Sequence, residues 1–233
     1  MPGTLYVVGT PIGNLEDISE RALRILREVD YILCEDTRTT RKLLDRYEIK
    51  TSTFSYHQYS GAGKIDQLIR WLSDGKNLAL VSDAGTPGIS DPGAFLIEGV
   101  RKEFGEEAKV EGIPGASAVI TALSISGWPV DRFSFLGFLP HKKGRQTMIK
   151  DILSLDHPVA VYESKHRILK LMEELDTFST AAKIKIEIML GRELTKMFES
   201  CYFGTPAELA AKLKTDTDMG KGEFVVLIRK IKK

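Results

Sequence analysis

The first half of the chain alternates short apolar runs with longer stretches whose apolar residues recur at helical spacing. The apolar runs have the length of buried strands and lie at residues 5–8, 31–34, 51–56, 77–81 and 109–111. The helical stretches lie at residues 18–29, 39–46, 64–72 and 93–103. Because strands and helices alternate, we predict a mostly parallel sheet with helices on both of its faces.

The second half has a different pattern. A turn-rich segment at residues 113–117 precedes a small-residue helix at residues 118–126. Further helices are mixed with apolar strands at residues 159–162, 185–189, 197–203 and 224–228. We therefore predict an α/β fold of two domains. Residues 1–115 form the domain with the mostly parallel sheet, and residues 116–233 form a domain with a mixed sheet.

Two of the predicted helices carry capping signals at their starts. Asp17 and Glu20 have the spacing of a capping box before the first helix. Thr205, Pro206 and Glu208 combine an N-cap residue, proline at the first helical position and an N3 glutamate. Both patterns satisfy the free N–H groups of a helix start, so we expect both to form.

The composition is that of an ordinary globular protein, with 42% hydrophobic and 28% charged residues in 233. No apolar run reaches the roughly 18 residues of a membrane-spanning helix, and the start lacks the features of a secretory signal peptide. We expect a cytoplasmic protein without a membrane partner. Cys34 and Cys201 lie in predicted strands without metal-ligand spacing, so we expect buried thiols and no metal site.

The charge is unevenly distributed although the net charge is only +1. The first 120 residues carry 14 Lys and Arg against 18 Asp and Glu, and the remainder carry 19 against 14. A polyanion is therefore expected to meet the second half. Each basic cluster there is, taken alone, equally compatible with a solvated face. The clusters are Lys142, Lys143 and Arg145; Lys165, Arg167 and Lys170; and Arg229, Lys230, Lys232 and Lys233.

Glycine-rich loops follow three of the predicted strands in the first half, at residues 9–14, 82–93 and 114–117. The first loop lacks the residues of a Walker A loop and the third glycine of a dinucleotide fingerprint. A single such loop can be a tight turn that needs glycine. Three at the strand ends of one parallel sheet favour a ligand site, because ligands of such sheets bind beyond the carboxyl ends of the strands.

Two aspartates lie in the second of these loops. Asp91 precedes Pro92 and Gly93, an arrangement typical of a helix N-cap followed by proline at the first helical position. Asp83 has no such capping role. A carboxylate at a strand end can accept hydrogen bonds from an amine or a ribose, or help to deprotonate a hydroxyl. Asp83 is therefore the first candidate for a catalytic residue.

Several motifs together make the chain resemble the tetrapyrrole methylase superfamily, and within it the branch that acts on ribosomal RNA. They include Gly-Thr-Pro-Ile-Gly-Asn-Leu, Val-Ser-Asp-Ala-Gly-Thr-Pro and Gly-Arg-Glu-Leu-Thr-Lys, and they fall at residues 9–15, 34–38, 81–87, 135–140, 162–164, 191–196 and 221–223. The resemblance implies a two-domain tetrapyrrole-methylase-like fold that holds S-adenosylmethionine in a cleft between the domains. It also implies a homodimer that methylates a cytidine ribose 2′-hydroxyl of small-subunit (16S) ribosomal RNA, free or in the small ribosomal subunit.

No metal is expected in the site; the candidate bases are chosen for their places at strand or turn ends, the RNA contacts for the basic clusters, and the cofactor contacts from the resemblance. Besides Asp83, the candidates for the catalytic base include Glu35 and Lys196, with Asp36 and His57 as further titratable residues. The expected RNA contacts are Lys142, Lys143, Arg145, Lys165 and Arg167. The expected cofactor contacts are Pro11, Ser82, Asp83, Ala84, Gly85, Ile89, Ser117, Ala118, Tyr162, Leu190 and Gly191.

The sequence departs from the family pattern at three places. Ala116 and Lys165 stand where proline is usual, and Ser60 stands where asparagine is common. Lys165 lies in a segment that the resemblance places toward the RNA, so this departure concerns the RNA contacts and not the cofactor site. Two other functions remain open. A small-molecule tetrapyrrole (precorrin-type) methyltransferase is less favoured, because that branch has Gly-x-Gly-Pro-Gly-Asp in the first loop. A non-catalytic ribosome-binding factor would keep the fold and bind no S-adenosylmethionine.

Overall fold

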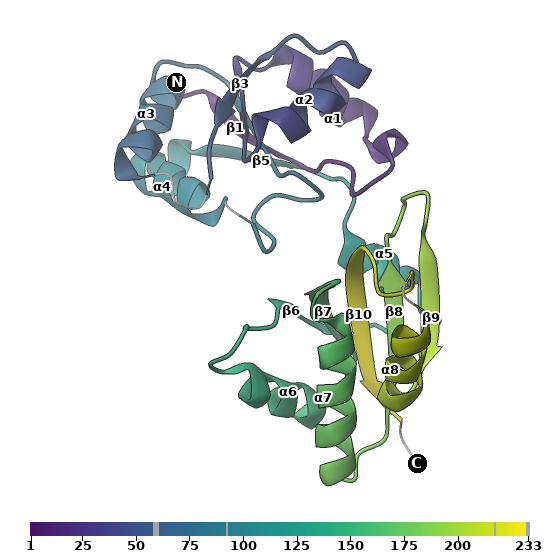
Figure 1. Cartoon of the computed structure of the whole chain (residues 1–233). Helices are drawn as coiled ribbons and strands as arrows, with labels where there is room; N and C mark the ends of the chain where they lie inside the picture. The colour runs from purple at the N-terminus through teal and green to yellow at the C-terminus, as the bar shows by residue number, and fades with distance from the viewer. Residues whose placement is uncertain (58–60, 92, 217, 232–233) are drawn as a thin grey trace. The chain divides into compact units, whose positions relative to one another are not determined.

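The computed structural model describes residues 1–57, 61–91, 93–216 and 218–231, in two compact units (Figure 1). The units are Met1–Ser117 and Ala118–Lys233, so the second begins two residues after the start expected from the sequence. Pro92, expected at a helix start, and Lys232 and Lys233 of the basic tail lie outside the described residues. In the described part of the chain, no helix is both long and apolar enough to cross a membrane.

The first unit is built on a five-stranded sheet in the order β3-β2-β4-β1-β5. Every strand pair in it is parallel, which confirms the prediction for the first half. The strands are β1 (Thr4–Val8), β2 (Tyr31–Cys34), β3 (Ser52–Ser55), β4 (Leu78–Val81) and β5 (Lys109–Ile113).

Helices cover both faces of this sheet, as the alternation of strands and helices predicts (Figure 1). Successive residues of a strand point to opposite faces, so Ile32 packs in the core beneath α1 and α2 and Leu33 in the core beneath α3 and α4. The helices are α1 (Glu20–Glu28), α2 (Thr37–Arg46), α3 (Ala62–Ser73) and α4 (Ala94–Phe104), with 3-10 turns η1 (Leu15–Asp17) and η2 (Gly105–Glu107).

The second unit contains a mixed sheet, as predicted, in the order β6-β7-β10-β8-β9. The β6–β7 pair is parallel and the other pairs are antiparallel. The strands are β6 (Ser134–Phe138), β7 (Val159–Ser164), β8 (Ile186–Arg192), β9 (Ser200–Gly204) and β10 (Glu223–Lys230). The helices are α5 (Ala118–Ile125), α6 (Arg145–Ser154), α7 (Ile168–Ala181) and α8 (Pro206–Thr215). One core joins α6, α7 and α8 to this sheet.

One of the two expected capping boxes forms. At α8, Glu208 Oε2 accepts from Thr205 N at 2.8 Å and Thr205 Oγ1 accepts from Glu208 N at 3.3 Å. The box expected from Asp17 and Glu20 is wrong, because Asp17 ends the 3-10 turn η1. The N-cap of α1 is Ser19, which accepts from the main-chain N–H two residues after Glu20.

The cysteines differ in burial. Cys34 is buried in β2, as expected, whereas Cys201 is exposed. The expectation for Cys201 is wrong because β9 is an edge strand, where a sequence pattern of apolar residues overstates the burial of alternate positions.

Candidate functional site

Four loops of the first unit follow neighbouring parallel strands and therefore meet at one edge of the sheet. In the order β2, β4, β1, β5, these loops begin at residues 35, 82, 9 and 114. This edge is where the sequence predicts a ligand site, because ligands of parallel sheets bind beyond the carboxyl ends of the strands.

The loops after β1 and β5 touch at two glycines. A Cβ atom on Gly9 would lie 2.7 Å from the Cα of Gly115, and a Cβ on Gly115 would lie 2.6 Å from the carbonyl oxygen of Gly9. No side chain fits there. The sequence interpretation was that glycines allow a ligand to approach the backbone, but at these two positions the approaching group is the other loop.

Thr10 ties the loop after β1 to the loop after β4. Its N–H donates to the carbonyl of Gly85 at 2.9 Å, and its hydroxyl lies 3.1 Å from the carbonyl oxygen of Ser82. Gly85 has φ +86°, a conformation that favours glycine. Thr86 in turn donates to the carbonyl of Ala116 at 3.3 Å. Thr10 is buried and was not singled out from the sequence, although its place in the Gly-Thr-Pro motif was a signal.

Ser82, directly after β4, interacts with the carboxylates of Glu35 and Asp91, and Asp83 follows it in the chain. The Ser82 hydroxyl donates to Glu35 Oε1 at 3.4 Å. Burial, and next the charges of Asp83 and Asp91, raise the pKa of Glu35. Burial also raises the pKa of Asp91. Glu35 and Asp91 are therefore the two carboxylates at this edge whose pKa lies above the ordinary value, which makes each a stronger proton acceptor than an unperturbed carboxylate.

Asp83 is exposed and accepts from the main-chain N–H of Asp36 at 3.2 Å. Asp36 is the N-cap of α2 and accepts from the N–H of Arg38 at 2.8 Å. Hydrogen bonds from the Arg38 side chain and main chain lower the pKa of Asp36 to about 2. A carboxylate with so low a pKa is a poor base, so Asp36 acts here as a helix cap that also positions Asp83.

Asp91 does not cap a helix, contrary to the sequence expectation. Helix α4 begins at Ala94, its N-cap is Gly93, and that cap has no side-chain hydrogen bond. The carboxylate of Asp91 accepts instead from the main-chain N–H of Gly88, within its own loop. Asp91 therefore fixes the shape of the glycine-rich loop after β4.

The expected cofactor residues of the first unit are partly gathered at this edge. Residues 82–85 follow β4 directly, and Pro11 and Ser117 belong to the flanking loops. Asp83, Ala84 and Ile89 are exposed, with Ile89 at 53%, whereas Pro11, Ser82 and Gly85 are buried.

The remaining expected cofactor residues belong to the second unit. Tyr162 on β7 and Gly191 on β8 both pair with Val225 of β10, so they lie at one level of that sheet. Tyr162 is half-buried, and Leu190 and Gly191 are buried. Ala118 is half-buried and opens helix α5.

Lys196, a candidate base from the sequence, also lies in the second unit. Its Nζ is 2.7 Å from Glu223 Oε2 and 3.2 Å from Glu193 Oε1. Burial lowers the pKa of Lys196, but the two carboxylates together outweigh burial and raise it above the usual value. The ammonium group stays protonated near neutral pH, which argues against a role as base. His57, the other open candidate, is exposed just after β3.

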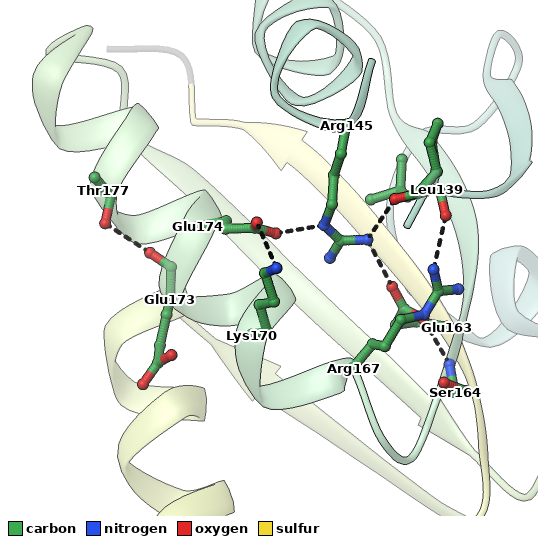
Figure 2. Close-up of polar contacts among 10 residues, drawn as sticks. Leu139, Arg145, Glu163, Ser164, Arg167, Lys170, Glu173, Glu174 and Thr177 are labelled. Carbon is green, nitrogen blue, oxygen red and sulfur yellow. Dashed lines mark hydrogen bonds and ion pairs between the residues drawn. The ribbon is translucent and has the colours of Figure 1, made fainter. Parts of the chain in front are cut away.

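The expected RNA contacts separate into two groups. Lys142, Lys143 and Lys165 are exposed on the loops that follow β6 and β7. The side chains of Arg145 and Arg167 are only 3% and 15% exposed, and both form ion pairs with Glu163 (Figure 2). Such burial argues against direct phosphate contact by these two arginines, which the clustering of basic residues in the sequence could not reveal.

One exposed aromatic residue was missed from the sequence. Phe138 at the end of β6 is 54% exposed and its ring centroid lies 5.4 Å from that of Tyr162. It adjoins the loop that carries Lys142 and Lys143. Exposed aromatic rings beside basic residues are typical of surfaces that bind single-stranded nucleic acid.

Among the residues that the structure describes, no group of three or more His, Cys, Asp and Glu side chains is arranged to hold a metal ion. The polar groups at the first-unit edge are carboxylates, which accept hydrogen bonds, a serine hydroxyl and main-chain groups. These groups suit hydrogen bonds to hydroxyls and amines.

Comparison with known proteins relates the chain to methyltransferases. The profile of the tetrapyrrole (corrin/porphyrin) methylases matches residues 4–210. The chain is 45% identical to ribosomal RNA small subunit methyltransferase I of Vibrio cholerae, over 96% of this chain and 76% of that protein.

Solved structures with the same fold include two distant enzymes. Diphthine synthase superposes with a TM-score of 0.73 at 18% identity, covering 97% of this chain and 90% of the other. The uroporphyrin-III C-methyl transferase of Thermus thermophilus, complexed with S-adenyl homocysteine, superposes with a TM-score of 0.64 at 16% identity and covers 97% of both chains.

Proposed function

We propose that this chain, which belongs to the tetrapyrrole (corrin/porphyrin) methylase family, transfers a methyl group from S-adenosylmethionine to RNA of the small ribosomal subunit. The observation that carries the proposal is the 45% identity to a ribosomal RNA small subunit methyltransferase across nearly the whole chain. The tetrapyrrole methyltransferase of similar fold is only 16% identical, so its substrate is the less favoured alternative.

The first-unit edge fits S-adenosylmethionine by its chemistry. Asp83 offers an exposed carboxylate to ribose hydroxyls or an amino group, and Ile89 offers an exposed apolar side chain to a purine. Gly88 has φ +84°, and a Cβ on it would meet no atom within 4 Å, so the main chain there is open to a ligand. Pro11, Ser117, Ala118, Tyr162, Leu190 and Gly191 remain proposed contacts on the strength of the resemblance.

When bound, S-adenosylmethionine supplies an electrophilic methyl group on a sulfonium ion. The protein then has to orient the attacking hydroxyl and accept its proton as the new bond forms. We assign the proton to Glu35, whose raised pKa suits this task and whose Oε1 accepts from Ser82. Asp83 helps to raise the pKa of Glu35 and, held by the N–H of Asp36, offers its carboxylate to the cofactor.

The RNA is held by the second unit in this proposal. Lys142, Lys143 and Lys165 provide exposed positive charge, and Phe138 provides an exposed ring for an unpaired base. The acceptor atom is a cytidine ribose 2′-hydroxyl, the protein acts in the cytoplasm, and it works as a homodimer; these three points rest on the family resemblance.

Incubation with S-adenosylmethionine labelled in the methyl group tests the proposal. Small-subunit RNA and intact small subunits are offered separately, and the labelled nucleotide is then mapped. Label on one cytidine that becomes resistant to alkaline cleavage is expected, because 2′-O-methylation removes the attacking hydroxyl. Label on a base would exclude the ribose as acceptor. Binding of S-adenosylmethionine without transfer to either RNA substrate would contradict the proposed substrate, and no cofactor binding by calorimetry would favour a non-catalytic ribosome-binding factor.

A further inference from the structure

The two loops that carry the exposed lysines start at the same edge of the second sheet. Strands β6 and β7 are parallel neighbours, with Phe138 opposite Tyr162 at their carboxyl ends. The chain then enters residues 139–144 after β6 and residues 165–167 after β7. Lys142, Lys143 and Lys165 therefore share one edge, but a shared edge alone does not fix how far apart the loops lie.

A buried carboxylate lies between these loops. The side chain of Glu163, at the end of β7, is 0% exposed. Its Oε2 is 3.3 Å from Arg145 Nη1, and its Oε1 is 2.7 Å from Arg167 Nε. Oε1 also accepts from the main-chain N–H of Ser164 at 2.8 Å. A buried carboxylate is tolerated only when cations and donors surround it in this way.

Both arginines also bind the loop after β6 (Figure 2). Arg167 Nη1 donates to the carbonyl of Leu139 at 2.9 Å, and Arg145 Nη1 donates to the carbonyl of Pro140 at 3.4 Å. Arg145 Nε also donates to Glu174 Oε2 of α7 at 2.7 Å. Two consecutive carbonyls of one loop are thus tied, through the arginines, to the end of β7 and to α7.

We infer that Glu163 is a positioning residue for RNA binding. With Arg145 and Arg167 it forms a clamp that fixes the position of the lysine-bearing loop after β6 relative to the loop after β7. This inference rests on the proposed function and names the part of the fold that organises its RNA surface. The clamp residues do not touch RNA. They set the position of Lys142 and Lys143, which follow the Pro140 carbonyl by two and three residues.

The test measures coupling between the clamp and the lysines. A fragment of small-subunit ribosomal RNA is titrated over a salt series. Replacing Lys142 and Lys143 together by alanine removes two contacts, which lowers the slope of log affinity against log salt by about 1.4 at roughly 0.7 per contact on single-stranded RNA. In the Glu163→Gln background, the same double replacement should lower the slope by less than half as much, because the lysines are no longer held in place.

Enzyme kinetics give a second readout. Glu163→Gln should raise the KM for RNA, while turnover at saturating RNA and the Kd for S-adenosylmethionine stay near those of the wild-type protein. A merely structural role would lower the active fraction without this split. The matched control is Glu187→Gln, which removes a carboxylate 2.6 Å from Arg229 in the same sheet without touching either loop. In that control the lysine replacements should have their full effect.

Arg167→Lys serves if Glu163→Gln fails to fold. Lysine keeps a positive charge beside Glu163 but lacks the planar group that reaches the Leu139 carbonyl. Replacing Lys142 and Lys143 by alanine should therefore again change the salt slope by less than in the wild-type background. If replacing Lys142 and Lys143 lowers the salt slope as much in a folded clamp variant as in the wild-type background, the inference is overturned. If that variant and the wild-type protein still methylate small-subunit RNA, the proposed function stands and only the clamp fails. A wild-type protein that binds or methylates no such RNA would overturn both.

Discussion

The carboxyl edge of the first sheet holds its loops by main-chain contacts, whereas the β6–β7 edge of the second sheet holds its loops by charged side chains. At the first edge Gly9 packs on Gly115, and Thr10 bonds to the carbonyl of Gly85. At the second edge Glu163 pairs with two arginines that bind loop carbonyls. In the first arrangement, carboxylates are exposed or half-buried beside the accessible main chain of the loop after β4. In the second, lysines are exposed on loops that a buried ionic network holds.

This difference matches the two tasks that a methyltransferase of RNA has to combine. A small cofactor needs close approach to the main chain and a few polar groups. A polyanion needs positive charge held at a defined spacing. The charge bias agrees, since the first 120 residues carry more acidic than basic residues and the remainder carry more basic ones.

The largest effect is expected from Glu35→Gln at the first edge. Turnover should fall by about 10²–10⁴-fold, the usual contribution of general base catalysis, while the Kd for S-adenosylmethionine changes little. Single-turnover methyl transfer measures the loss, and Glu98→Gln, an exposed carboxylate on α4, is the control. Wild-type rates in Glu35→Gln would remove Glu35 from the mechanism.

The raised pKa of Glu35 also predicts how the stability of the fold depends on pH. Its pKa is raised in the folded protein by burial and by Asp83 and Asp91. A raised carboxyl pKa stabilises the fold at pH below the unfolded value, and this contribution is lost as the pH rises through the folded value. Glu35→Gln should therefore be at least as stable as the wild-type protein at neutral pH. As the pH falls, the wild-type protein should gain stability relative to Glu35→Gln. Denaturant unfolding at several pH values checks the sign.

At the second edge, Arg145→Ala should act on stability. Removing one partner of a buried ion pair typically costs about 3–5 kcal/mol of unfolding free energy. The cost here falls toward the lower end of that range, because Glu163 keeps Arg167 and Glu174 keeps Lys170 as a cation. Lys142→Ala, three residues away and exposed, should change it by less than about 0.5 kcal/mol. Urea unfolding of the two variants decides this. Equal stability would show that Arg145 is not part of a buried network.

Gly9→Ala tests the main-chain packing of the first edge. The added Cβ would lie 2.7 Å from the Cα of Gly115, and overpacking of this kind costs about 1–3 kcal/mol. S-adenosylmethionine binding should weaken together with stability. Gly63→Ala is the matched control, since a Cβ there meets no atom within 4 Å and lies in helix α3. Both variants are compared by calorimetry and thermal unfolding, and an unaffected Gly9→Ala would contradict the described contact.

The smallest effect on turnover is expected from Asp83→Asn, because this carboxylate is assigned to the cofactor and not to the proton. Burial is the main reason for the raised pKa of Glu35, and the charge of Asp83 is the second. Removing that charge should shift the acidic limb of the rate profile to lower pH while much of the turnover at neutral pH remains. Single-turnover rates across pH measure the limb. If the acidic limb does not shift, it does not report the titration of Glu35. If turnover falls as much as in Glu35→Gln, Asp83 is the base.

Much of the fold follows from the sequence alone. Apolar runs and helical spacing located all five strands of the parallel sheet and its covering helices, because a strand buried on both faces is a continuous apolar run and a helix that buries one face repeats its apolar residues at helical spacing. The loops after β1, β4 and β5 were recognisable by their glycines, and the capping box of Thr205 by its spacing. The signals failed at two helix starts. Ser19 and not Asp17 caps α1. Asp91 accepts from a main-chain N–H within its own loop, while Gly93 is the N-cap of α4 and has no side-chain hydrogen bond.

Only the tertiary structure decided which charges are buried and with which partners. Arg145 stands in the sequence beside exposed lysines, yet it pairs with Glu163 and Glu174, which are 18 and 29 residues away. Asp83 meets the N–H of Asp36 across 47 residues. Periodicity reports the environment of an element averaged over its face, whereas the burial of a charge depends on groups that approach it from distant segments. The sequence alone determined the parallel sheet, its strand-end loops and the basic half, whereas strand β6 of the second sheet was not predicted. The packing of the chain decided which charged side chains stay exposed to bind a substrate.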